Sequence, residues 1–329
     1  MENKVIILMY HRVADETCDP WALCVTPRHF DEQMDVLRKS VIVMPLNQLP
    51  QAIVEVSATR RSVAITFDDG YADNIHAAKP ILERYDFPGT FFLVSNYLGS
   101  QVEFWWDELD RLLLQPGSLP ARFEVSINGS GLQAFLREAT DYSQESYNLN
   151  RNWRAWENPP TPRHSLYYSL WKQLRPMNQD NREQILEKLR HWANAGSEAR
   201  TSRRTISNSE VFALSKDRLI EIGCHTMTHP QLSALSPSMQ SDEIRGCKKN
   251  LEEIVGRPVK SFAYPYGGND DYTAETVSIV RRMGFSSACS TLPGLITGDS
   301  DPLQLPRMPV EDWSGEQFEK TLSKWFDEA

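Results

Sequence analysis

Cysteine is scarce in this chain. Five of the 329 residues are cysteine, the number is odd, and no Cys-x-x-Cys pair occurs. Neither a disulfide framework nor a cysteine-ligated zinc site is therefore indicated. We expect all five to be buried or incidental thiols: Cys18, Cys24, Cys224, Cys247 and Cys289.

Long apolar runs and excess positive charge are also missing. No window approaches the roughly 20 apolar residues of a membrane-spanning helix. The apolar stretch 5–10 is too short for a secretory signal and no small-residue cleavage site follows it, so we expect a cytoplasmic protein. Lys and Arg number 35 against 44 Asp and Glu, without a basic cluster, which argues against nucleic acid or an anionic membrane as partner. The oligomeric state stays open.

Strand and helix patterns alternate in two parts of the chain, and this favours an α/β fold. The apolar content of 40% suffices for a large core. Thr26 and Pro27 mark a helix start, and Gly256 a helix end. The expected strands are 5–10, 62–67, 90–94, 219–223, 259–263, 286–290 and 303–307. The expected helices are 26–39, 71–85, 238–255, 273–283 and 316–326.

Residues 105–212 interrupt this alternation. The segment is rich in aromatic residues and proline, and "FWWDELDRLLL" and "NREQILEKLRHWANA" have helical patterns. We therefore expect a barrel-forming domain at 1–104 and 213–329 and a mostly helical insertion at 105–212. The insertion is either a cap that determines the substrate or a packed structural appendage.

The stretch "SVAITFDDGYADN", residues 62–74, ends a buried strand in two adjacent acids. In α/β folds, ligands bind at the carboxyl ends of parallel strands. Three further polar clusters follow expected strands, at "YHR", "GCHTMTHPQL" and "FAYPYGG". Each cluster alone is common as a turn or a structural feature, so the signal lies in their joint occurrence.

His225 and His229 are four residues apart, and this spacing lets two imidazoles face one point if the segment coils. Two histidines and one carboxylate form an open metal site suited to one divalent ion, zinc first, with cobalt, nickel or iron as alternatives. One aspartate of the pair would bind the metal. The other would stay free to act as a base on water.

These motifs resemble the NodB-homology polysaccharide deacetylases, carbohydrate esterase family 4. The resemblance rests on "TFDDGY", "HTMTHPQL" and "FAYPYG" and covers about residues 5–100 and 213–310. It implies an irregular (β/α) barrel of seven or eight strands and the hydrolysis of N-acetylated sugars. An acetylated carbohydrate is thus the expected substrate, and surface-polysaccharide biosynthesis the expected context.

The resemblance also implies roles for single residues. Asp68 would be the catalytic base, and Asp69, His225 and His229 the metal ligands. The amide of Tyr266 would help to hold the oxyanion, in a turn shaped by Pro265.

Two departures from the family pattern change this assignment. The usual arginine of the third motif is missing, because Ala263 and Tyr264 occupy that stretch, and the usual late Leu-x-His is absent. The opening "ILMYHRV" resembles a permuted branch of the family, in which His11 would be the general acid. Arg307 is either a substitute for the missing arginine, orienting Asp68, or a structural ion-pair partner.

Aromatic residues of the insertion are candidates for stacking on sugar rings, and Trp106 is the one we single out. Two alternative functions remain. An allantoinase-like hydrolase of cyclic C–N bonds often lacks part of the metal triad, which is intact here. A non-catalytic glycan-binding relative would not need both aspartates and His11.

Overall fold

The computed structural model describes residues 4–49, 61–127 and 129–327. The chain divides into two compact units. Unit 1 consists of Met1–Asp15, Leu23–Ser100 and Thr205–Ala329, and unit 2 of Glu16–Ala22 and Gln101–Arg204. Within the described ranges, no helix combines the length and the apolar character needed to cross a bilayer.

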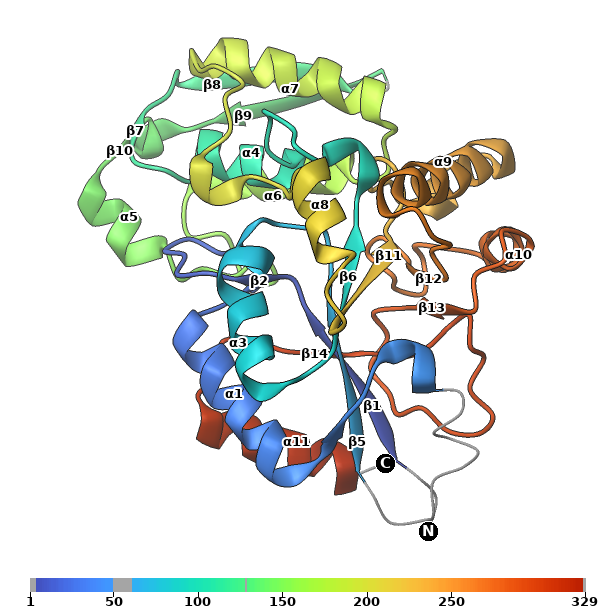
Figure 1. Ribbon diagram of the computed structural model, residues 1–329. Helices are drawn as coiled ribbons and strands as arrows, with labels where there is room; N and C mark the ends of the chain where they lie inside the picture. The colour runs from blue at the N-terminus through green and yellow to red at the C-terminus, as the bar shows by residue number, and fades with distance from the viewer. Residues whose placement is uncertain (1–3, 50–60, 128, 328–329) are drawn as a thin grey trace. The chain divides into compact units, whose positions relative to one another are not determined.

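Unit 1 is built on a parallel sheet of eight strands in the order β13-β12-β11-β6-β5-β1-β14, with β4 paired to β5 (Figure 1). A single-residue bridge joins Cys289, at the end of β13, to Leu305, just before β14, so the two ends of the sheet approach each other. The expected α/β class and barrel-like parallel sheet are confirmed. The strands are β1 Val5–Tyr10, β4 Ile42–Val43, β5 Ser62–Phe67, β6 Gly89–Leu93, β11 Ile220–Cys224, β12 Ser261–Ala263, β13 Ser287–Cys289 and β14 Met308–Pro309.

Strand β1 is buried on both faces, as a central parallel strand requires. Its residues alternate between two apolar clusters. Val5 and Ile7 pack in a small cluster with residues of β5, β6, β12 and β13, inside the curved sheet. Ile6 and Leu8 belong to the larger cluster between the sheet and the surrounding helices. The period-2 pattern thus places one apolar set inside the barrel and the other under the helices.

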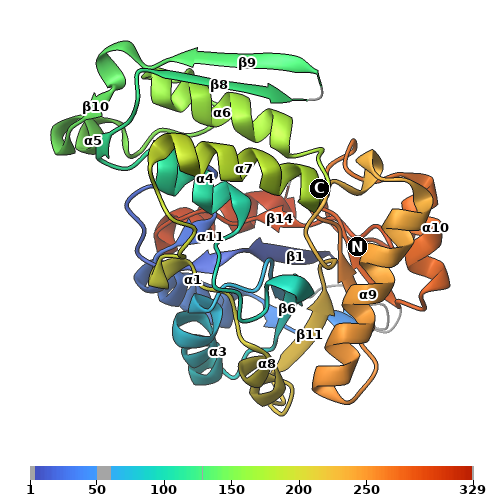
Figure 2. The same cartoon turned by 90° about the horizontal axis from the view of Figure 1, so that it is seen from above.

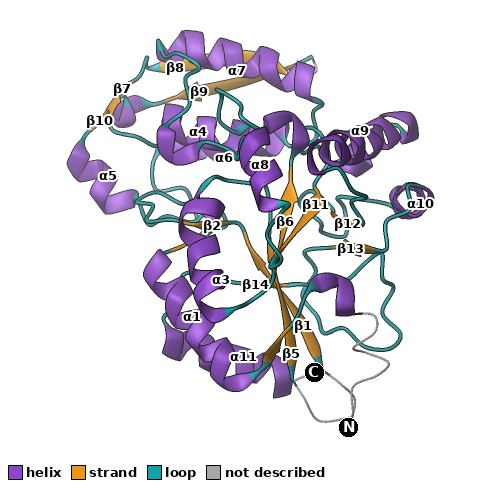
Figure 3. Cartoon of the chain, viewed as in Figure 1, coloured by secondary structure: helices purple, strands orange, loops and turns teal. Residues whose placement is uncertain are grey.

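The helices of unit 1 begin and end at the expected capping residues. The Thr26 side chain accepts a hydrogen bond from the His29 amide at the start of α1, and Gly256, with φ +69°, ends α9. Figure 3 shows the strands of this unit bordered by helices, and Figure 2 shows α9 alongside β11. The helices are α1 Pro27–Ser40, α3 Lys79–Tyr85, α8 Asn208–Leu214, α9 Pro237–Val255, α10 Ala274–Arg282 and α11 Gly315–Asp327.

Two expected elements differ from the structure. The strand expected at 303–307 is reduced to the single bridge of Leu305 with Cys289, and the residues that pair with β1 are Met308 and Pro309. Leu303 and Leu305 are buried as a strand pattern requires, but Pro306 has no N–H to donate to a ladder. The helix expected at 71–85 is α-helical only from Lys79, after a π-helical turn at Asn74–Ala78.

Unit 2 combines helices with a β-hairpin. The hairpin pairs β8 with β9 and buries Phe123, Val125 and Ile127 on one face. Its elements are α4 Trp105–Leu113, β7 Gly117–Ser118, β8 Arg122–Ile127, β9 Ser130–Phe135, β10 Asp141–Tyr142, α5 Gln144–Asn150, α6 Pro162–Leu174 and α7 Gln179–Ala193. The segment Glu16–Ala22 joins this unit, for example through a hydrogen bond from the Ala155 amide to the Pro20 carbonyl.

Candidate active site

The polar clusters lie at one edge of the sheet of unit 1, because the parallel strands that carry them are in register. Tyr10 pairs with Phe67, so His11 and Asp68 follow neighbouring strand ends. Cys224 pairs with Leu93 on one side and Phe262 on the other, and the histidine loop follows it. The sequence-distant motifs therefore meet at the carboxyl ends of β1, β5, β11 and β12 (Figure 1).

Asp69, His225 and His229 form one buried cluster. Oδ1 of Asp69 lies 3.5 Å from Nε2 of His225 and 3.4 Å from Nε2 of His229, and one ligand atom of each residue lies within 4.8 Å of the others. Two ligands about 2.0–2.1 Å from a tetrahedral zinc are about 3.3–3.4 Å apart. Oδ1 of Asp69 is buried and accepts no hydrogen bond from the described residues. The donor set and spacing therefore fit a divalent cation.

The backbone at this cluster has an unusual conformation. Asp69, Thr226, His229 and Tyr266 all have positive φ, between +55° and +72°, a region that non-glycine residues rarely adopt. Such conformations concentrate at ligand sites, where the surrounding contacts hold them in place. The loop 225–229 is irregular rather than helical, so these turns, not helical spacing, bring the two imidazoles together.

The loop between the two histidines is held by Glu243 of α9. One carboxylate oxygen accepts hydrogen bonds from the amides of Met227 and Thr228, both at 2.9 Å, and the other accepts the Thr228 hydroxyl at 2.7 Å. Within the loop, the Thr226 hydroxyl accepts a bond from the His229 amide. Sequence reasoning missed Glu243, since no local signal marks one acidic residue on an amphipathic helix.

A main-chain carbonyl fixes the orientation of His225. Nδ1 lies 2.8 Å from the carbonyl oxygen of Ala263, which can only accept a hydrogen bond, so Nδ1 carries the proton. The lone pair of Nε2 then points toward Asp69. In metal-ligating histidines, the ring nitrogen that does not bind the metal typically donates such a hydrogen bond.

Asp68 forms a buried ion pair with Arg307. Two guanidinium nitrogens lie 2.7 Å from the two carboxylate oxygens, and the third donates to the Ser290 carbonyl. Burial alone would raise the pKa of Asp68, but the charge of Arg307, with smaller contributions from His225 and His11, holds this pKa well below its usual range. Asp68 is therefore ionised at neutral pH, and Arg307 is its bidentate ion-pair partner.

His11 is half-buried and directly follows β1, beside the strand end that carries the aspartates. Its charge contributes to the lowered pKa of both Asp68 and Asp69. The Asp68 amide donates to the Tyr10 carbonyl at 3.0 Å, so the two strand ends remain paired up to the site. His11 thus belongs to the same site as the two acids.

Pro265 and Tyr266 lie in a tight turn after β12. The Gly267 amide donates to the Pro265 carbonyl at 2.6 Å, which makes Tyr266, with φ +60°, the centre of a γ-turn. The Tyr266 ring lies 4.7 Å from the His229 ring, at 76°. The turn is therefore next to the Asp69–His225–His229 cluster.

Trp106 lies in unit 2 and is 7% exposed, stacked on Phe104 with ring centroids 4.5 Å apart. Little of its surface is available to a ligand. Trp156 of the same unit is 61% exposed, which makes it the better-presented ring.

Comparisons with known proteins identify what the chain and its fold are similar to. A profile of the family described as "Polysaccharide deacetylase" matches residues 55–117 and 188–288. A Bacillus subtilis (strain 168) protein named as a polysaccharide deacetylase, YxkH, is 20% identical over 318 residues, 96% of this chain and 75% of that protein. The fold is similar to the Streptococcus pyogenes deacetylase PplD, solved with acetate, at TM-score 0.56 and 17% identity over 98% of this chain and 99% of that one. It is also similar to IcaB from Ammonifex degensii, at TM-score 0.57 and 17% identity over 98% and 96%.

Proposed function

The chain belongs to the polysaccharide deacetylase family, and from this premise we propose that it is a metal-dependent hydrolase that removes the acetyl group from an N-acetylated sugar. The observation that carries the proposal is the buried Asp69–His225–His229 cluster beside an ionised Asp68. These three side chains would hold one divalent cation, zinc first among the candidates. Such a cation, when bound, acts as a Lewis acid and makes water a nucleophile near neutral pH.

The residues around the cluster supply the remaining steps. Asp68, kept ionised by Arg307, takes a proton from the attacking water while the water oxygen bonds to the acetamide carbon. The Tyr266 amide donates to the carbonyl oxygen as that oxygen gains negative charge. His11 gives a proton to the nitrogen as the C–N bond breaks. The products are acetate and a free amino sugar.

Unit 2 is proposed to select the substrate. Exposed Trp156 supports this role, since an aromatic face stacks on a sugar ring. Trp106 and Pro265 stay predicted substrate contacts. The expected cytoplasmic location and the expected role in surface-polysaccharide biosynthesis also stay predictions.

The test measures metal content and acetate release together, across acetylated mono-, oligo- and nucleotide-linked sugars. Asp68→Asn is expected to retain the metal and to lose at least about 10²-fold in kcat, the scale of general-base assistance. Asp86→Asn is the control, because it makes the same aspartate-to-asparagine substitution at an exposed side chain. Near wild-type hydrolysis by Asp68→Asn would reject the base assignment.

A further inference from the structure

The main chain around His11 is held by Asp73 and Asn74, the last two residues of the stretch "SVAITFDDGYADN". The side-chain amide of Asn74, which is 1% exposed, donates to the His11 carbonyl at 2.9 Å. One oxygen of Asp73 accepts the Val13 amide at 3.1 Å, and its other oxygen accepts Nε of Arg12 at 2.9 Å. His11 and the two residues after it are therefore each bound to the stretch 73–74.

Arg12 makes this attachment stiff. Its side chain is fully buried, and its guanidinium lies over the Tyr71 ring, 4.7 Å from the ring centroid. A buried guanidinium paired with a carboxylate and packed on an aromatic face has few alternative positions. Arg12 thus anchors the chain next to His11, which is itself half-buried.

The same stretch also carries the acids of the site. Asp68 and Asp69 lie four to six residues before Asp73 and Asn74, and the Asp68 amide binds the Tyr10 carbonyl. The segment 68–74 therefore carries the two carboxylates at its start and also binds the main chain of residues 10–13, which includes His11. The π-helical turn that begins at Asn74 is a conformation found frequently at functional sites.

We infer that Asp73 and Asn74 are positioning residues for His11, which hold its imidazole where it can protonate the departing amine. The inference rests on the proposed function, because it assigns the purpose of His11 to proton donation. Proton transfer depends steeply on geometry, and a displacement of about 1 Å can cost about 10²-fold in rate. We call the hydrogen bonds from Asp73 and Asn74 to residues 11–13 the clamp. Because the clamp holds the main chain of the proton donor, we expect it to affect the rate of proton transfer.

Two variants test the clamp. Asp73→Asn removes the counter-charge of Arg12 and weakens the bond to Val13. Should it fold poorly, because the buried Arg12 then loses its ion pair with Asp73, Asn74→Leu carries the test. The Oδ1 atom of Asn74 has no hydrogen-bond partner among the described residues, so a leucine of similar size loses only the bond to His11. Asp86→Asn is the matched surface control.

The kinetic measurement compares two substrates. An N-acetyl sugar needs a protonated leaving group, whereas an activated aryl acetate ester does not. Both variants are expected to lose at least about 10-fold in kcat on the N-acetyl sugar and less than about 2-fold on the ester, with His11→Gln showing the same split more strongly. Damage to the fold or to the metal ligands would lower both activities together.

A second measurement does not depend on activity. In ¹H–¹⁵N spectra of histidine-labelled protein, His11, assigned with His11→Gln, is expected to give one narrow set of ring signals that broadens or divides in both clamp variants. Unchanged His11 signals, or equal losses on the two substrates, would overturn the positioning inference. If His11→Gln instead lost activity equally on the N-acetyl sugar and the ester, the role of His11 as the acid would be refuted, and with it that part of the proposed function.

Discussion

Removal of the Glu243 carboxylate is expected to weaken metal binding, because this carboxylate holds the loop between two of the proposed metal ligands. The carboxylate accepts three hydrogen bonds from Met227 and Thr228, the residues between His225 and His229. In Glu243→Ala all three donors lose their partner. The loop then loses the contacts that hold its two central residues, which lie between Thr226 and His229, both at positive φ.

The size of the effect follows from these contacts. A hydrogen bond to a charged group contributes about 1.5–3 kcal/mol, so three bonds contribute at most about 4.5–9 kcal/mol to holding the loop. The donors are partly buried, and water replaces part of this loss. Loss of such a supporting contact typically lowers metal affinity by about 10–100-fold, or about 1.4–2.8 kcal/mol. We expect Glu243→Ala to fall in this range and Glu243→Gln, which keeps an acceptor oxygen, to lose less.

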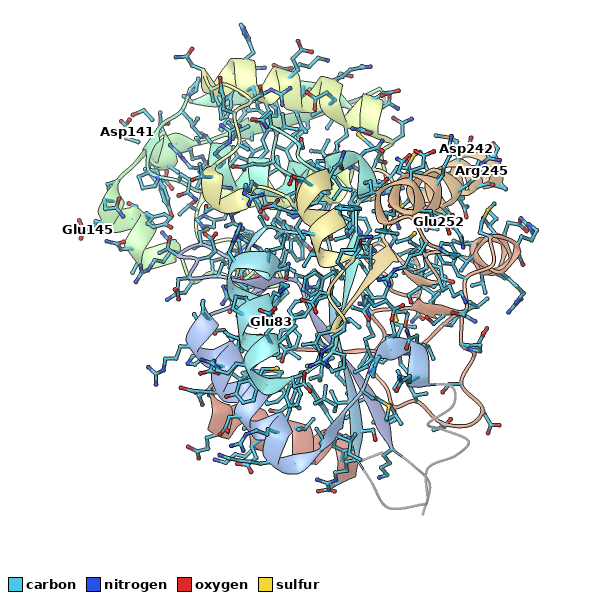
Figure 4. The ribbon with its side chains drawn as sticks, in the orientation of Figure 1. Glu83, Asp141, Glu145, Asp242, Arg245 and Glu252 are labelled. Carbon is cyan, nitrogen blue, oxygen red and sulfur yellow. The ribbon has the colours of Figure 1, made fainter. Side chains whose placement is uncertain are left out.

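The assay is competition for Zn²⁺ against a chromophoric chelator, with unfolding curves of the metal-free proteins run in parallel. Asp242→Ala is the matched control, because the neighbouring Asp242 projects from the exposed side of α9, where it pairs with Arg245 (Figure 4). A Glu243→Ala protein that folds and binds Zn²⁺ as tightly as Asp242→Ala would refute the reasoning.

Two further predictions concern charge. Arg307→Met should move the acid limb of the pH–rate profile to higher pH, because burial then raises the pKa of Asp68 without the opposing guanidinium charge. The same variant should destabilise the fold by about 3–5 kcal/mol. An acid limb at the wild-type pH would contradict the role of the ion pair. Burial, with the nearby charge of Arg163, lowers the pKa of His164 to about 4, below its unfolded value of about 6.5. The folded state therefore binds fewer protons, and stability should fall by up to about 3 kcal/mol between pH 6.5 and pH 4. His164→Asn should lack this component when urea unfolding is compared at pH 7 and pH 4, and parallel losses in both proteins would count against it.

Local signals in the sequence predicted the elements that depend on local physics. The β-branched runs gave β1 and β5, and Thr26, Pro27 and Gly256 marked helix ends by capping chemistry. The strand expected at 303–307 is only a bridge at Leu305, and β14 begins three residues later, because burial alone does not determine which residues pair with β1.

The site was predicted less completely, for a related reason. The residue types of the Asp69–His225–His229 cluster were recognisable, but the loop 225–229 reaches its shape through positive φ angles at Thr226 and His229, which no side-chain pattern encodes. The supports Glu243, Asp73 and Asn74 act through contacts between segments far apart in sequence. Such contacts appear only once the strands are in register.

The central claim is that Asp69, His225 and His229 hold one divalent ion on which hydrolysis depends. The most direct measurement is Zn²⁺ stoichiometry and acetate release from N-acetyl sugars on the same samples of wild type and Asp69→Ala, before and after chelation. We predict one ion per chain and metal-restorable activity in the wild type, and neither in Asp69→Ala. Acetate release that survives both chelation and the loss of Asp69 would contradict the account.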